Sequence, residues 1–431
     1  MTHPDSYLNR RRFLIGSATV ASSLQLGCDK QEQVVTPTET GRKQAPLRIL
    51  MLGQPGVEEI ISRGWQAISE QELKIEVVEL ERANSDGIGD VFLEAATKAD
   101  LVIYPLALVG EAARSDTVVE ITSDDIQRIE AKAGPLYSAA RNGAARYGAS
   151  TFALPLGCKL PALLSRSKLQ PLESWESYDK LVEDEWDGMA AEPTADGWAG
   201  TMFMWRCSGL ENWLFERGSL APMINTEPYV KSLDLMLRTN SRYTQRDCTP
   251  DQIWSLVAAG ELQGGIGFPE RSSESESDAR LLSLPEAETV SKVMLDPFSP
   301  VVSLSANCRQ TSASKLFIAW ICGGEGSGSV RRQIAGMGDL RDGGISSGDA
   351  GAYESWLSQQ LQAPLIAACP QLNSAMGYLT VLDEQVRQAL AGECTAQEAL
   401  NDVAERWQSL TSSEGLEEQM RAWRMAQGMR S

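Results

Sequence analysis

Three apolar segments separated by amphipathic ones constrain the fold of this chain more than any other feature. Residues 47–53 are almost continuously apolar and end at the turn-forming sequence Gln-Pro-Gly. A helical pattern follows over 57–69, then an alternating strand pattern over 73–80, a further helical stretch, and an apolar run over 100–105. This strand–helix–strand–helix–strand order with short connections predicts a parallel, doubly wound sheet in an α/β fold.

The predicted strands also indicate where a ligand would bind. In a doubly wound sheet the ligand lies outside the carboxyl ends of the strands. Gln54 and Glu58 follow the first predicted strand, and Tyr104 lies at the end of the third. We therefore take these three residues as candidate ligand contacts, against the alternative that they are ordinary positions without a ligand.

The N-terminal sequence has the features of an export signal. Arg10, Arg11 and Arg12 precede Phe-Leu and a short apolar stretch that continues to residue 26 without an acidic side chain. Paired arginines before Phe-Leu indicate the twin-arginine route. The stretch is shorter than the ~20 residues that a membrane-spanning helix needs. We expect residues 1–28 to be a twin-arginine signal rather than a buried N-terminal helix.

The predicted signal ends at Cys28, preceded by a glycine. A cysteine at this place can become the lipid-modified N-terminus of a lipoprotein, although Gln25 stands where such signals usually carry leucine. Two expectations stay open: the exported protein is free in the periplasm, or a lipid on Cys28 holds it at the outer face of the cytoplasmic membrane. The polar residues 29–46 read as a flexible tether.

Charge and residue usage exclude several classes of function. The formal net charge of −19 argues against nucleic acid and anionic membrane surfaces as partners. The one histidine, His3, lies in the predicted signal, so the rest of the chain cannot carry Ser-His-Asp or Cys-His catalysis or a histidine-ligated metal. The cysteines after Cys28 form no C-x-x-C motif, and both disulfides and reduced thiols remain open for them.

Several segments in the same order resemble the family 1 extracellular solute-binding proteins, the sugar-binding components of bacterial ABC importers. The clearest is Gly-Glu-Cys-Thr-Ala-Gln-Glu-Ala-Leu, followed by Trp407, which is similar to the terminal helix of that family. It also contains a helix-capping box. The other similar segments are 152–157, 163–169, 175–181 and 258–267.

This resemblance implies two α/β lobes joined by a hinge, with a ligand cleft at their interface. We expect lobe 1 to comprise 47–156 and about 297–345, and lobe 2 to comprise 157–296 and about 346–431. It further implies a monomer without cofactor, metal or catalytic activity. Such a protein binds a small molecule, in this family a sugar, and delivers it to the membrane subunits of an ABC permease.

Sugar sites stack rings on aromatic faces and satisfy hydroxyls with polar side chains. Trp205 and Arg206 lie where members of the family often contribute an aromatic platform, and Lys159 and Glu270 lie in predicted loops after strands. We add these four to the candidate contacts, against the alternatives of a core tryptophan and exposed charges. Two other functions stay open: a sensor or scaffold with the same fold, and an exported carbohydrate-active hydrolase that uses two carboxylates.

Overall fold

A computed structural model describes the protein over residues 45–211, 213–270, 278–285, 292, 294–323, 326–335, 340–341, 351–362 and 367–429, without the side chains of 145, 334 and 335. The predicted signal, Cys28 and most of the predicted tether lie outside these ranges. The described residues belong to a compact unit that spans 44–431. Within the described ranges, no helix combines the length and the apolar character needed to cross a membrane.

The first sheet contains the three strands expected from the sequence. The strands β1 (Leu47–Gly53), β2 (Leu73–Glu79) and β3 (Leu101–Pro105) pair in the order β2-β1-β3, and both pairings are parallel. This confirms the predicted parallel arrangement. The strand β12 (Pro300–Ser305) then pairs antiparallel with β3, although almost 200 residues separate the two. The sheet is completed on β12 by β4 (Val118–Val119) and β7 (Leu154–Pro155).

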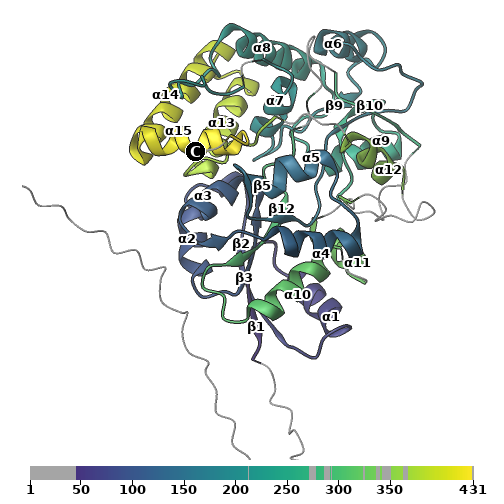
Figure 1. The fold of residues 1–431 in the computed structure, drawn as a ribbon. Coiled ribbons are helices and arrows are strands. Elements are labelled where there is room, and N and C mark those ends of the chain that lie inside the picture. Colours follow the sequence, from purple (N-terminus) through teal and green to yellow (C-terminus); the bar gives the residue numbers. More distant parts are fainter. Residues whose placement is uncertain are drawn as a thin grey trace, which may run out of the picture. The chain divides into compact units, whose positions relative to one another are not determined.

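Helices cover both faces of this sheet (Figure 1). On one side α1 (Val57–Gln66) packs near α10 (Thr311–Ile321). The ring of Trp65, which is fully buried, lies edge-on to Phe317 at 5.3 Å and tilted against Trp320 at 5.4 Å. On the other side lie α2 (Ile88–Ala96) and α3 (Val109–Arg114). The remaining elements of this part are η1 (Arg82–Asn84), η2 (Leu106–Leu108), α4 (Ser123–Ala133), α5 (Ser138–Ala140), η3 (Arg141–Ala145), β5 (Arg146–Tyr147), β6 (Ser150–Thr151) and α11 (Gly328–Ala335).

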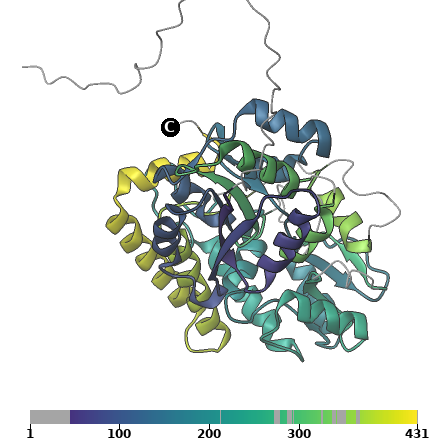
Figure 2. The same ribbon diagram turned by 90° about the horizontal axis from the view of Figure 1, so that it is seen from below.

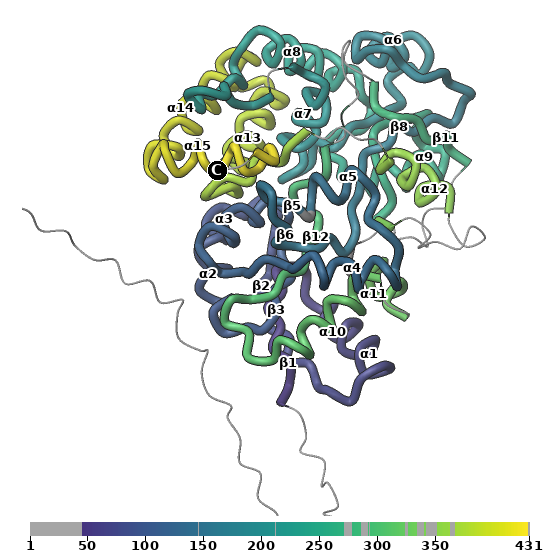
Figure 3. The backbone as a smooth tube through the Cα atoms, viewed as in Figure 1, coloured from purple at the N-terminus to yellow at the C-terminus, as the bar shows by residue number. Residues whose placement is uncertain are grey.

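A second sheet lies in another part of the same unit (Figure 3). Its order is β11 (Arg280–Leu282), β8 (Ala162–Ser165), β10 (Gly264–Gly267) and β9 (Ala190–Ala191), with β8 antiparallel to both of its neighbours. The helix α9 (Pro250–Ala259) packs on β10, and α6 (Trp175–Asp184) and α12 (Ala352–Gln360) complete this part. The helix α9 begins with a cap, because the Thr249 hydroxyl accepts a hydrogen bond from the Gln252 amide.

A further group of helices includes the C-terminal ones, which are drawn in yellow (Figure 1 and Figure 2). It contains α7 (Ala199–Cys207), α8 (Glu227–Arg242), α13 (Ala375–Leu390), α14 (Ala396–Glu414) and α15 (Leu416–Ala426). The predicted capping box of α14 is confirmed, since Thr395 and Glu398 each accept a hydrogen bond from the other's backbone amide. The helix α13 contacts α7 and α14, and it also contacts η1, η2 and α2 from the first sheet. It therefore packs both within this group of helices and against elements that adjoin the first sheet.

Candidate ligand-binding site

The site is built around Arg82, which η1 places directly after β2 of the first sheet. Its guanidinium carbon lies 3.5 Å from the ring centroid of Trp198 and 4.2 Å from that of Phe298. The same group forms an ion pair with Asp296, and the exposed fractions of the two side chains are 15% and 8%. Gly197 allows this approach: it has a φ of 76°, and a Cβ there would lie 2.4 Å from Cβ of Arg82.

A pocket with a volume of about 260 Å³ opens beside this arginine. Its walls come from η1, from the N-terminal end of α7, from the segment before β12 and from one face of α13. Carboxylates, guanidinium groups, an amide and two hydroxyls surround a single aromatic ring, so the pocket can donate and accept many hydrogen bonds. The lining residues are Arg82, Ala83, Asn84, Asp196, Gly197, Thr201, Phe298, Leu379, Thr380, Asp383, Glu384 and Arg387.

Hydrogen bonds to one carboxylate and an ion pair fix α13 against the start of α7 at this pocket. The carboxylate of Asp383 accepts hydrogen bonds from the backbone amides of Gly197 and Gly200, both at 2.9 Å. Burial raises the pKa of Asp383, while these amides and the nearby Arg82 lower it. At the rim, Arg387 forms an ion pair with Asp196. The charged groups of Asp383, Asp196 and Arg387 therefore already have partners within the pocket wall.

An aromatic cluster of Trp198, Trp205 and Phe268 lies behind the pocket. The Trp198 ring is 6.3 Å from Trp205 and 5.7 Å from Phe268. The ammonium of Lys159 lies 5.2 Å from the Phe268 ring, and burial lowers its pKa against the opposing field of Asp296 and other carboxylates. The structure thus brings two sequence-predicted residues, Lys159 and Trp205, to one cluster.

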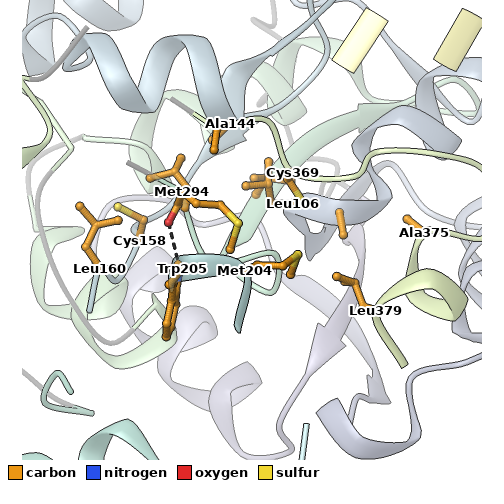
Figure 4. Close-up of a cluster of buried hydrophobic side chains, with 14 of the residues drawn as sticks. Leu106, Ala144, Cys158, Leu160, Met204, Trp205, Met294, Cys369, Ala375 and Leu379 are labelled. Atoms are coloured by element: carbon orange, nitrogen blue, oxygen red, sulfur yellow. Dashed lines mark hydrogen bonds between the residues drawn. The ribbon is translucent and has the colours of Figure 1, made fainter. Parts of the chain in front are cut away.

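Trp205 itself belongs to a cluster of buried hydrophobic side chains (Figure 4). It is 2% exposed, and its indole nitrogen donates a hydrogen bond to the Met294 carbonyl at 3.2 Å. The cluster joins Leu106 after β3 to side chains of α7 and α13. The labelled members are Leu106, Ala144, Cys158, Leu160, Met204, Trp205, Met294, Cys369, Ala375 and Leu379.

The same apolar cluster covers the carboxyl end of β3. Tyr104 is fully buried, its ring stacks on Phe92 at 4.7 Å, and its hydroxyl bonds to the Ser303 hydroxyl at 2.8 Å. Burial raises the pKa of this phenol well above its usual range. Tyr104 therefore packs within the first sheet and does not line this pocket, and its role as a ligand contact stays a prediction.

The other four predicted contacts also lie away from the pocket. Gln54 is exposed after β1, and the carboxylate of Glu58 accepts a hydrogen bond from the nearby Gly56 amide at 2.7 Å. Arg206 is buried in an ion pair with Glu192 and lies over the Trp175 ring at 4.3 Å. Glu270 is exposed after β10. Their roles as ligand contacts remain predictions.

The residues that do line the pocket carried weak sequence signals. Arg82 and Asn84 follow β2, so the strand-end rule applied to that strand would have pointed to them. Thr380 and Asp383 lie one turn apart on α13, and such a pattern also describes any half-exposed helix face. The meeting of η1, α7 and α13 depends on tertiary packing, which no local pattern of the sequence reveals.

Sequence comparison gives no relative, since neither a protein-family model nor a curated protein matches the chain. Its structure is similar to a solute-binding protein of an ABC transporter from Agrobacterium radiobacter K84 in complex with ribitol, with a TM-score of 0.65, 15% identity, and coverage of 85% of this chain and 99% of the other. It is also similar to maltose-bound MalE3 of T. maritima, with a TM-score of 0.66, 15% identity, and coverage of 84% and 100%.

A third similar structure is the GacH receptor of Streptomyces glaucescens, which was solved unliganded and with acarbose. Its TM-score is 0.62 at 11% identity, and the match covers 85% of this chain and 99% of the receptor. The chain has the two-lobe fold of the maltose-binding type of periplasmic binding protein. These matches cover nearly the full length of each neighbour, which confirms the fold class predicted from the sequence. At such low identity they show the fold alone.

Proposed function

We propose that the protein captures a small polyhydroxylated solute, a sugar or a polyol, in the pocket beside Arg82 and delivers it to an ABC-type permease. The observation that carries this proposal is the composition of the pocket, in which η1, the start of α7 and α13 contribute polar side chains to one small space. The volume of about 260 Å³ lies just below the ~300–1,000 Å³ usual for ligand pockets, which favours a monosaccharide or a linear polyol.

The chemistry of the lining supports a hydroxyl-rich ligand over an anion or an apolar compound. Asn84, Glu384 and the two threonines can exchange hydrogen bonds with hydroxyls, and the Phe298 ring offers an apolar face for carbon-bound hydrogens. Cations and carboxylates occur together, so no single charge sign dominates. The binding of ribitol and maltose by two structural neighbours agrees with this class of ligand.

The proposed lobes place the pocket at their interface. Lobe 1, at 47–156 and about 297–345, contributes Arg82, Asn84 and Phe298 to the pocket. Lobe 2, at 157–296 and about 346–431, contributes the start of α7 and the face of α13. A solute that contacts both lobes favours the closed state, because only that state offers all its partners.

We further propose export by the twin-arginine route, with Cys28 as the site of lipid attachment.

A thermal-shift screen of the purified chain against sugars, polyols, amino acids and phosphate esters tests the ligand class. A true ligand raises the melting temperature with its concentration. The Asn84→Ala variant should lose that response, while Asn307→Ala, at an exposed asparagine that does not line the pocket, should keep it. A panel in which no sugar or polyol stabilises the protein would remove the basis for the assignment.

The delivery step needs its own test. A permease encoded beside the gene supports import, and a neighbouring sensor kinase supports the sensor alternative. Uptake of the ligand found in the screen should fall in cells that lack this protein and recover with the wild-type chain. Normal uptake in such cells would count against the transport function and leave ligand sensing as the role of the fold.

A further inference from the structure

Arg82 fills a slot whose walls belong to other segments of the chain. Trp198 precedes α7, while Asp296 and Phe298 precede β12, and all three contact the guanidinium. The arginine reaches this slot from η1, which follows β2. One side chain thus links the edge of the first sheet to the start of α7.

The slot has the chemistry of a cation site. Aromatic faces carry negative potential and attract cations, most strongly where water is excluded. A guanidinium is planar and weakly hydrated, so it suits contact with rings better than an ammonium does. Asp296 is buried and supplies the opposing charge. A carboxylate this deeply buried is costly without a positive partner, and Arg82 is the cation that pairs with it.

We propose that Trp198, Phe298 and Asp296 form a cation-binding slot, and that Arg82 is its resident occupant. The slot accepts a free compound that carries a guanidinium group once the arginine side chain is shortened. In the intact chain, Arg82 takes the place of such a compound and holds the two halves together without a bound solute. This proposal does not depend on which solute the neighbouring pocket binds.

Arg387 provides a comparison within the same pocket. It forms an ion pair with Asp196, but the exposed fractions of the two side chains are 44% and 61%. Within the described residues, no aromatic ring lies under its guanidinium. Removal of Arg387 therefore leaves no ring-lined slot and no buried carboxylate. The Arg387→Ala variant is a matched control for Arg82→Ala.

The experiment uses the full chain labelled with 5-fluorotryptophan, and the Trp198→Phe variant assigns the fluorine resonance of Trp198. Methylguanidinium chloride is titrated into wild type, Arg82→Ala and Arg387→Ala, with sodium chloride at equal concentration as the ionic control. In Arg82→Ala we expect a saturable shift of the Trp198 resonance, with a Kd on the order of millimolar, and a parallel rise in melting temperature.

Wild type and Arg387→Ala should show neither response, because the slot is full in both. No saturable shift in Arg82→Ala, or an equal shift in all three proteins, would overturn the proposal. If Arg82→Ala does not fold, Arg82→Gln replaces it, because glutamine keeps the stem to Cδ and vacates the guanidinium position. The same criteria then apply. Failure of the sugar screen leaves this result unaffected, so the two proposals stand or fall separately.

Discussion

Glu111 is a buried acid whose surroundings favour its neutral form. It lies on α3 and is 9% exposed, and Oε2 has no hydrogen-bond partner among the described residues. Gly89 leaves room for it, since a Cβ there would come within 2.7 Å of Oε1. Burial is the main cause that raises its pKa to about 7, and the carboxylates of Asp90 and Glu414 add to the effect.

The size of the expected effect follows from this pKa. A rise from the ordinary 4.5 to about 7 corresponds to roughly 3 kcal/mol, because each pKa unit is worth about 1.4 kcal/mol. The folded protein holds the proton more tightly than the unfolded chain does. The resulting stability is therefore complete below pH 4.5, decreases as the pH rises through 4.5 to 7, and is absent above that range.

The Glu111→Gln variant tests this reasoning, because glutamine has nearly the same shape and stays neutral. At pH 8 we expect the variant to exceed wild type in free energy of unfolding by up to about 3 kcal/mol, and at pH 4.5 the two should agree. Urea unfolding followed by circular dichroism at intervals between these pH values measures the difference. The exposed Glu94→Gln on α2 is the control. A difference that is independent of pH would refute the assignment of Glu111 as the titrating group.

Three further predictions concern stability and thiol chemistry. Asp100 accepts four hydrogen bonds from Arg48 and Arg309, which hold its pKa at about 2 against the ordinary 3.8. The Asp100→Asn variant should therefore lose about 2 kcal/mol in free energy of unfolding at neutral pH. In urea unfolding, the advantage of wild type over this variant should fade as the pH drops from 3.8 to 2. The Glu192→Ala variant should lose about 3–5 kcal/mol in free energy of unfolding in the same assay, because it leaves the buried guanidinium of Arg206 uncompensated. A loss under about 1 kcal/mol would contradict this expectation. All cysteines from Cys158 to Cys394 are free thiols. In Cys28→Ser protein, a thiol reagent should quickly modify only the half-buried Cys308 and Cys394. Rapid reaction of the other thiols before urea is added would refute their burial.

The first sheet could be predicted because its signals are local. The alternation between β1, α1, β2 and β3 is visible in a short window, since burial on both faces of a parallel strand gives a continuous apolar run. The strand β12 was not predicted. It pairs with β3 from far along the chain, and nothing within Pro300–Ser305 indicates its partner.

The site was harder to predict than the fold, for a physical reason. The strand-end rule pointed to Tyr104, but Leu106 and its neighbours seal that end of β3 with an apolar cluster. Whether a strand end stays open depends on which distant helix covers it, and here α13 does so. Lys159 and Trp205 came close to the pocket because they share an aromatic cluster with Trp198.

The position of α13 in the chain also affects the order in which the molecule can assemble during synthesis. The strands of both sheets are complete by Ser305, yet the wall formed by Leu379, Asp383 and Arg387 leaves the ribosome much later. Until then Leu106 and Met204 lack their cover, and the nascent chain exposes apolar surface that a chaperone can hold. The pocket can therefore form only after most of the chain has been made. A solute in the compartment where the chain is synthesised has no complete binding site on the growing polypeptide.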